Sequence, residues 1–276
     1  MLAVSIALTT AAGATFAGPL EDADEAIARS DYPAAFRLLQ SAAAGGNTAA
    51  QARLGILYQN GRGTPQNYAE ALKWYRLAAD KGFGAAQNNL GTMFENGLGV
   101  AQNYAEAVKW YRRAADLDYV EGQNNLANMV QKGLGVPQDY AEAVRLYRLA
   151  ADQRYAPAQN SLAGAYQKGL GVPQDFVEAV RLYRRAADQG DTFAQNNLGT
   201  MYASGQGVPQ DYVAALMWFN LSLALGNTVA TANRERAVSL MTPAQIAEAE
   251  RLARAWRPGP AGVPSIVIGP PKSGAP

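Results

Sequence analysis

The sequence lacks both cysteine and histidine over all of its 276 residues. Their absence excludes a Ser–His–Asp triad, a cysteine nucleophile, a zinc site built on His or Cys, and an iron–sulfur cluster held by cysteines. Disulfide bonds are excluded as well, although a cysteine-free chain tolerates oxidising and reducing compartments alike. We therefore expect a protein that is not an enzyme and that uses no metal and no cofactor.

The chain also lacks an excess of charge of either sign, because 24 Lys and Arg residues stand against 23 Asp and Glu residues. The resulting net charge of +1 supplies no electrostatic attraction to nucleic acid or to an anionic membrane. Hydrophobic residues make up 49% of the chain, which suits a globular protein with ample material for a core. We expect no nucleic acid among its partners.

Basic residues are missing from the start of the chain, where the first one is Arg29. Residues 1–17 carry no charge and end in small residues that resemble the cleavage site of a secretory signal, but such a signal normally opens with a basic residue. We expect export to the periplasm or the extracellular space; the alternative is an apolar N-terminal segment of a cytoplasmic protein. No other stretch approaches the roughly 18–20 apolar residues of a membrane span, so none is expected.

What the sequence does contain is a repeat. A Gly-x-Gly tripeptide returns every 36 residues, at 61–63, 97–99, 133–135, 169–171 and 205–207. A fixed period of this size is typical of a solenoid of stacked supersecondary units. It predicts five full units, which are residues 46–81, 82–117, 118–153, 154–189 and 190–225.

Each unit is expected to hold two helices. In the second unit Ala86, Leu90 and Phe94 share one helical face, and Gly97 suits the left-handed residue that ends such a helix. The second helix should begin after an N-cap residue, for which the five units offer Asn67, Asn103, Asp139, Asp175 and Asp211. A glutamate three residues later predicts a capping box at Glu70, Glu106, Glu142 and Glu178.

Small residues occupy one column of the first helices, namely Gly55, Gly91, Ala127, Ala163 and Gly199. They allow close approach of the second helices, whose rings we expect in the core: Tyr75, Tyr111, Tyr147 and Tyr183, with Trp74, Trp110 and Trp218 beside them. A single unit cannot cover its own apolar faces, so each unit needs its neighbour.

The two ends depart from the repeat. Residues 18–45 read as a half-repeat without the Gly-x-Gly turn, and residues 226–256 as C-terminal capping helices. The cap should cover a new apolar row made of Met217, Leu221 and Leu225, and its last helix should begin at Thr242, Pro243 and Gln245. Residues 257–276 are rich in Pro and Gly and are expected to be disordered.

The combined pattern Ala-Gln-x-Asn-Leu-Gly-x-Met-Tyr, Gly-x-Gly-Val-x-Gln-Asp-Tyr and Glu-Ala-x-x-Trp-Tyr-x-x-Ala-Ala resembles the Sel-one-like repeat, a relative of the tetratricopeptide repeat, and spans 46–225. The resemblance implies an all-α fold, a right-handed α/α superhelical solenoid of 36-residue helix–turn–helix units whose first helices line the concave side. It also implies an adaptor role in the assembly of complexes, often at the bacterial envelope.

On that concave side the first helices carry polar residues at i, i+4 and i+7. The candidate partner-binding residues are Asn88, Thr92, Glu95, Asn124, Asn128, Gln131, Asn160, Gln167, Asn196 and Thr200. Amides both donate and accept, so they can bind the backbone of an extended peptide without demanding charge. The alternative is that these residues are merely solvated. Five repeated glutamines are instead expected to satisfy the backbone of their own turns: Gln66, Gln102, Gln138, Gln174 and Gln210.

Three functions remain open from the sequence. The first is a non-enzymatic scaffold that binds a partner protein or peptide along the concave face. The second is envelope-associated β-lactam binding or hydrolysis, which the resemblance suggests because some cysteine-rich members have it, although this chain lacks their cysteines. The third is a passive, self-associating structural protein.

Overall fold

The computed structural model describes residues 18–259, so the N-terminal segment 1–17 and nearly all of the expected disordered tail lie outside the described residues. All regular secondary structure in that range is helical, which confirms the all-α prediction. The helices are α1 (Pro19–Ala28), α2 (Tyr32–Ala44), α3 (Thr48–Asn60), α4 (Tyr68–Asp80), α5 (Gly84–Asn96), α6 (Tyr104–Asp116), α7 (Val120–Lys132), α8 (Tyr140–Asp152), α9 (Ala156–Lys168), α10 (Phe176–Asp188), α11 (Thr192–Ser204), α12 (Tyr212–Ala224), α13 (Ala230–Val238) and α14 (Pro243–Ala255). None of them is long and apolar enough to cross a membrane.

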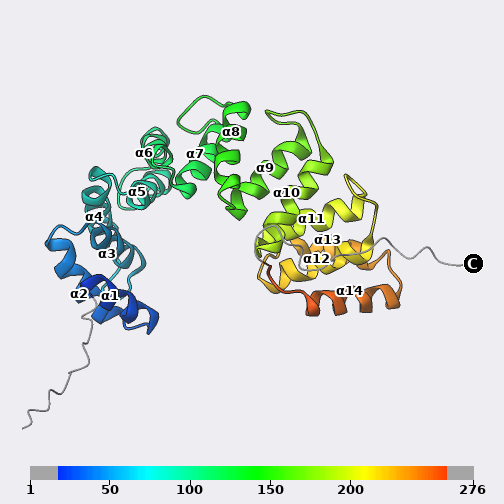
Figure 1. Ribbon diagram of the computed structural model, residues 1–276, viewed down its shortest axis with the longest axis horizontal. Coiled ribbons are helices and arrows are strands. Elements are labelled where there is room, and N and C mark those ends of the chain that lie inside the picture. The colour runs from blue at the N-terminus through cyan, green and yellow to red at the C-terminus, as the bar shows by residue number, and fades with distance from the viewer. Residues whose placement is uncertain (1–17, 260–276) are drawn as a thin grey trace, which may run out of the picture.

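The helices stack in chain order into an open arc, with α1 and α2 at one end and α13 and α14 at the other (Figure 1). Each helix from α1 to α12 packs on the next one and α14 packs on α12, and the first helices of neighbouring repeats also meet, as α5 does with α7, α9 with α11 and α11 with α13. In Figure 1, α5 and α7 lie on the inner side of the arc and α6 and α8 on its outer side. The predicted solenoid of helix pairs is therefore confirmed, and the first helices form its concave wall.

The ends of the helices follow the sequence closely. Each first helix from α3 to α11 ends at a glycine in the left-handed region, with φ between 65° and 70° at Gly61, Gly97, Gly133, Gly169 and Gly205. Each second helix from α4 to α12 is capped by the predicted Asn or Asp side chain, which accepts the backbone N–H three residues on. Both predictions are confirmed.

The capping boxes predicted for α4, α6, α8 and α10 are wrong. A capping box needs the backbone N–H of the N-cap residue, but in Asn103 this group donates to Phe94 O at 2.8 Å, and in Asp139 to Val130 O at 3.1 Å. With that donor taken, the glutamates bind the cation three residues on instead, as Glu142 does with Arg145 at 2.7 Å. The same exchange occurs for Glu70 with Lys73, Glu106 with Lys109 and Glu178 with Arg181.

Within a repeat, the second-helix tyrosine packs flat against the small residue of the first helix. A Cβ atom placed on Gly91 would lie 2.6 Å from the Tyr111 ring, and one on Gly55 would lie 2.6 Å from Tyr75. The four repeated tyrosines are no more than 2% exposed. At Gly55 and Gly91 the ring therefore occupies the place that the methyl group of an alanine would take.

Between repeats, the second glycine of each Gly-x-Gly turn touches the preceding repeat. Gly135 has φ 70°, and a Cβ on it would lie 2.3 Å from the carbonyl carbon of Tyr104, the first residue of α6. The same close approach occurs at the other four turns, from Gly63 to Tyr32, Gly99 to Tyr68, Gly171 to Tyr140 and Gly207 to Phe176. The turn of one unit thus packs directly against the first residue of the second helix of the preceding unit.

At the C-terminal end, α13 and α14 cover α12. Trp218 is 2% exposed and meets Trp256 of the cap edge-on, with 6.1 Å between ring centroids. Thr242 and Gln245 form the predicted capping box of α14. Met217 and Leu221 are buried as expected, but Leu225 is 58% exposed, because it follows the last turn of α12 where the chain leaves the helix.

Replacing Gly91 by Ala should destabilise the protein by about 1–3 kcal/mol, because the added methyl group overlaps the Tyr111 ring. Gly164 is the matched control, since it is also helical but a Cβ there meets only Tyr183 Oη, at 3.6 Å. Gly164→Ala should stabilise by about 0.5–1 kcal/mol through helix propensity. Urea unfolding followed by circular dichroism measures both changes, and a Gly91→Ala protein as stable as wild type would refute the packing account.

Candidate functional site

The asparagines predicted to line the concave face lie between neighbouring first helices. Asn125 Nδ2 donates to Asn88 Oδ1 at 2.9 Å, and Asn197 Nδ2 donates to Asn160 Oδ1 at 3.0 Å. At the last repeat Asn233 of α13 donates to Asn196 Oδ1 at 2.9 Å. Asn88, Asn124 and Asn196 are only 6–8% exposed. Their first role is therefore to join one repeat to the next.

Between α5 and α13 this amide ladder has one gap. Asn124 should meet residue 161, but a serine stands there and Asn124 Oδ1 is buried without a hydrogen-bond partner. A buried acceptor of this kind carries a desolvation cost of about 1–3 kcal/mol. The gap lies between α7 and α9, in the middle of the arc.

A second polar row lies at the i+7 positions of the first helices. There the tyrosine hydroxyl of each second helix from α4 to α10 donates to a side-chain oxygen: Tyr75 to Gln59 at 2.7 Å, Tyr111 to Glu95 at 2.5 Å, Tyr147 to Gln131 at 2.9 Å and Tyr183 to Gln167 at 2.8 Å. Burial raises the pKa of each of these hydroxyls, so they stay protonated and keep donating.

The i+4 positions add contacts to the same hydroxyls. Asn128 Oδ1 lies 2.6 Å from Tyr147 Oη and shares its single proton with Gln131, and Thr92 Oγ1 lies 3.1 Å from Tyr111 Oη. Thr92 and Thr200 both donate to the backbone carbonyl four residues earlier, but Thr200 has no tyrosine hydroxyl beside it because the tyrosine position holds Phe219. The ten predicted residues thus lie on α5, α7, α9 and α11; Asn88, Asn124 and Asn196 are buried there and the other seven are half-buried.

The repeated glutamines of the turns behave as predicted. Gln66, Gln102, Gln138, Gln174 and Gln210 each donate from Nε2 to a backbone carbonyl seven residues earlier, at 2.8 Å. They hold the connection between the two helices of a repeat and are occupied by it. These residues are therefore structural.

Two hollows interrupt the concave face. The first, of about 250 Å³, opens above Gly164, which stands where the other repeats have Ile, Thr or Asn. Its lining is almost wholly neutral and polar: Gln131, Asn160, Ser161, Gln167, Lys168, Tyr183 and Asn197. Since packing does not require a glycine at position 164, the space is available to another molecule.

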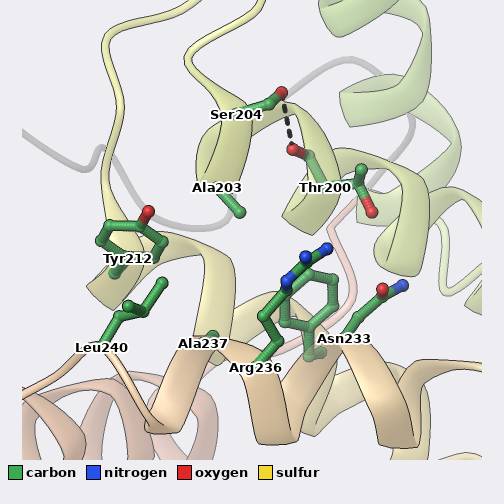
Figure 2. A pocket seen from close by; sticks show the side chains of 9 residues that line it. Thr200, Ala203, Ser204, Tyr212, Asn233, Arg236, Ala237 and Leu240 are labelled. Carbon is green, nitrogen blue, oxygen red and sulfur yellow. Dashed lines mark hydrogen bonds between the residues drawn. The ribbon is translucent and has the colours of Figure 1, made fainter.

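The second hollow, of about 260 Å³, lies between α11 and α13, and Figure 2 shows it from close by. Thr200, Ala203 and Ser204 approach from α11, and Asn233, Arg236 and Ala237 from α13, with Tyr212, Phe219 and Leu240 completing the lining. Asn233 and Arg236 are functional candidates that the sequence reasoning missed, because residues 226–256 were interpreted only as a cap. Continuing the 36-residue register from Asn197 and Thr200 would have found them.

The gap in the amide ladder can be closed by Ser161→Asn, which gives Asn124 Oδ1 a donor as in the other repeats. We expect a gain in stability of about 1 kcal/mol in urea unfolding. Ser161→Asp has the same shape but brings an acceptor, so it should not stabilise. Equal effects of the two substitutions would show that the amide pairing contributes nothing.

Comparison with known proteins agrees with this architecture. The Sel1 repeat model matches residues 24–47, 48–83, 84–119, 120–155, 156–191 and 192–227. The chain is similar to a crystal structure of a Sel1 repeat protein from Oxalobacter formigenes, with 32% identity over 88% of this chain and 100% of the other and a TM-score of 0.75. Protein 5086 of Pseudomonas aeruginosa shares the fold, with 20% identity over 75% of this chain and 83% of the other and a TM-score of 0.52. No curated protein sequence matches. The chain belongs to the Sel1 repeat family.

Proposed function

We propose that this protein is a non-enzymatic scaffold that binds a partner protein or peptide along the concave face of its solenoid. Sel1 repeat proteins are generally scaffolds for protein–protein interaction. The proposal places the contact on α5, α7, α9 and α11, with the hollow above Gly164 at its centre.

The observation that carries the proposal is a set of oriented amide donors. The Tyr183 hydroxyl donates to Oε1 of Gln167, which fixes this amide and turns its Nε2 group away. At Gln131 the single proton of the Tyr147 hydroxyl is shared with Asn128, so this amide is held less firmly. No hydrogen bond within residues 18–259 uses either Nε2 as donor. Both glutamines line the hollow above Gly164. Donors held at a fixed place without an internal acceptor suit the carbonyl oxygens of an extended peptide.

The outer face offers a weaker alternative. Its second helices carry the Glu–Lys and Glu–Arg pairs, whose charges neutralise each other on the same helix. Exposed pairs of this kind contribute little energy. A hollow of about 460 Å³ lies beside α6, but its lining is dominated by the charged side chains of Glu106, Lys109, Arg112, Arg113 and Asp116. The concave face instead combines space with amide donors held in a fixed orientation.

Gly164→Arg should fill the hollow and weaken partner binding at least tenfold, or by about 1.4 kcal/mol. Crosslinking in native cells, followed by identification of the captured proteins, provides the measurement. Lys109→Gln on the outer helix α6 is the control and should capture the same proteins as wild type. Capture that is unchanged by Gly164→Arg but lost with Lys109→Gln would move the binding surface to the outer face.

A milder substitution tests the amide donors themselves. Gln167→Glu can still accept the Tyr183 hydroxyl, as Glu95 does from Tyr111, but it has no N–H to give. We expect unchanged stability and weaker capture of the same partner. Equal capture would mean that the partner does not use this donor.

A further inference from the structure

The hollow between α11 and α13 exists because two side chains change together. The four preceding repeats pair a tyrosine hydroxyl with a Gln or Glu oxygen, but the fifth repeat has Phe219 and Ala203 at these positions. The hydroxyl and the carboxamide are thus both missing at one place. What remains is an apolar surface of Ala203 and Leu240, of which Leu240 is 59% exposed; Phe219 and Ala237 lie beneath it and are 1% and 2% exposed.

A single cation lies in this hollow. Arg236 belongs to its lining, and none of the ion pairs or hydrogen bonds formed within residues 18–259 uses its guanidinium. No acidic side chain lines the hollow. Asn233, one turn earlier on α13, donates a hydrogen bond to Asn196 on α11. This bond holds α13, and with it the backbone of Arg236, in place beside α11. Figure 2 shows Arg236 and Asn233 rising from α13 toward Thr200.

An apolar surface beside one unpaired guanidinium suits a ligand with an apolar group next to one carboxylate, which Arg can bind through two parallel hydrogen bonds. In an extended peptide, neighbouring side chains point to opposite sides. An acidic neighbour would therefore direct its carboxylate away from the hollow. Only at the C-terminus is a carboxylate attached to the same Cα as the apolar side chain.

The place of the hollow agrees with this chemistry. The row of first helices along the concave face ends at α13, which occupies the position of a further first helix beside α11. A peptide that lies along this face reaches its last contact here. We propose that the hollow binds the C-terminal residue of a partner peptide, with its apolar side chain against Ala203 and Leu240 and its α-carboxylate on Arg236; this deepens the proposed scaffold function and depends on it.

The test uses an acetylated pentapeptide of four alanines and a terminal leucine, made once with a free carboxylate and once as the amide. Chemical-shift titration of the isotope-labelled full chain should show the acid binding at least tenfold more tightly than the amide, with shifts around α11 and α13. Arg236→Gln should remove the preference for the acid. Arg254→Gln, which changes an exposed arginine of α14, should keep it.

A second variant fills the hollow with the side chains that the preceding repeats have at the same positions. The double substitution Ala203→Gln and Phe219→Tyr restores the pair found in the other repeats, so the protein should fold and melt cooperatively but no longer bind the peptide. Binding that survives this variant, no binding of the acid by wild type, or equal binding of acid and amide would overturn the proposal. If Arg236→Gln leaves partner capture intact while Gly164→Arg abolishes it, the scaffold function stands and the C-terminal pocket is wrong.

Discussion

The contact between each Gly-x-Gly turn and the helix start of the preceding repeat is the constraint on which the rest of the structure depends. At Gly135 the turn approaches Tyr104 so closely that no side chain fits, and the left-handed φ independently favours glycine. Because each unit is seated on the one before it in the same way, the same step is repeated along the chain and produces an arc. The concave wall, the amide ladder and both hollows follow from that repeated step.

Along this wall, polar groups come in pairs that belong to two helices. The tyrosine hydroxyls of the second helices meet Gln or Glu oxygens of the first helices, and where the tyrosine is absent, at Phe219, the glutamine is absent as well. Such coupling is expected when a buried polar group that loses its partner is costly. The departure from this pairing at Ala203 and Phe219 therefore marks a position where the surface is free to do something else, beside Arg236.

Local relations within a repeat could be predicted from the sequence. The helix ends at Gly97 and Asn103 and the glutamine that closes the turn, Gln102, depend on residues within about one turn of structure, and the structure has all three as expected. The capping boxes failed because the N–H of Asn103 is taken by Phe94, which lies on the other helix of the pair. The role of Asn88 could not be foreseen for a similar reason, since its partner Asn125 reaches it only through the stacking of two repeats.

If neighbour-to-neighbour contacts alone hold the solenoid, one whole period can be removed without damage. Deleting residues 84–119 joins Phe83 to Val120 and brings the repeat that begins with α7 onto α4, with the same type of contact as before. The most direct measurement is thermal unfolding of this variant by circular dichroism, beside a variant that lacks only residues 84–101. The account predicts a helical, cooperatively unfolding protein for the whole-period deletion and loss of cooperative unfolding for the half-period deletion. Equal tolerance of both deletions, or unfolding by both, would contradict it.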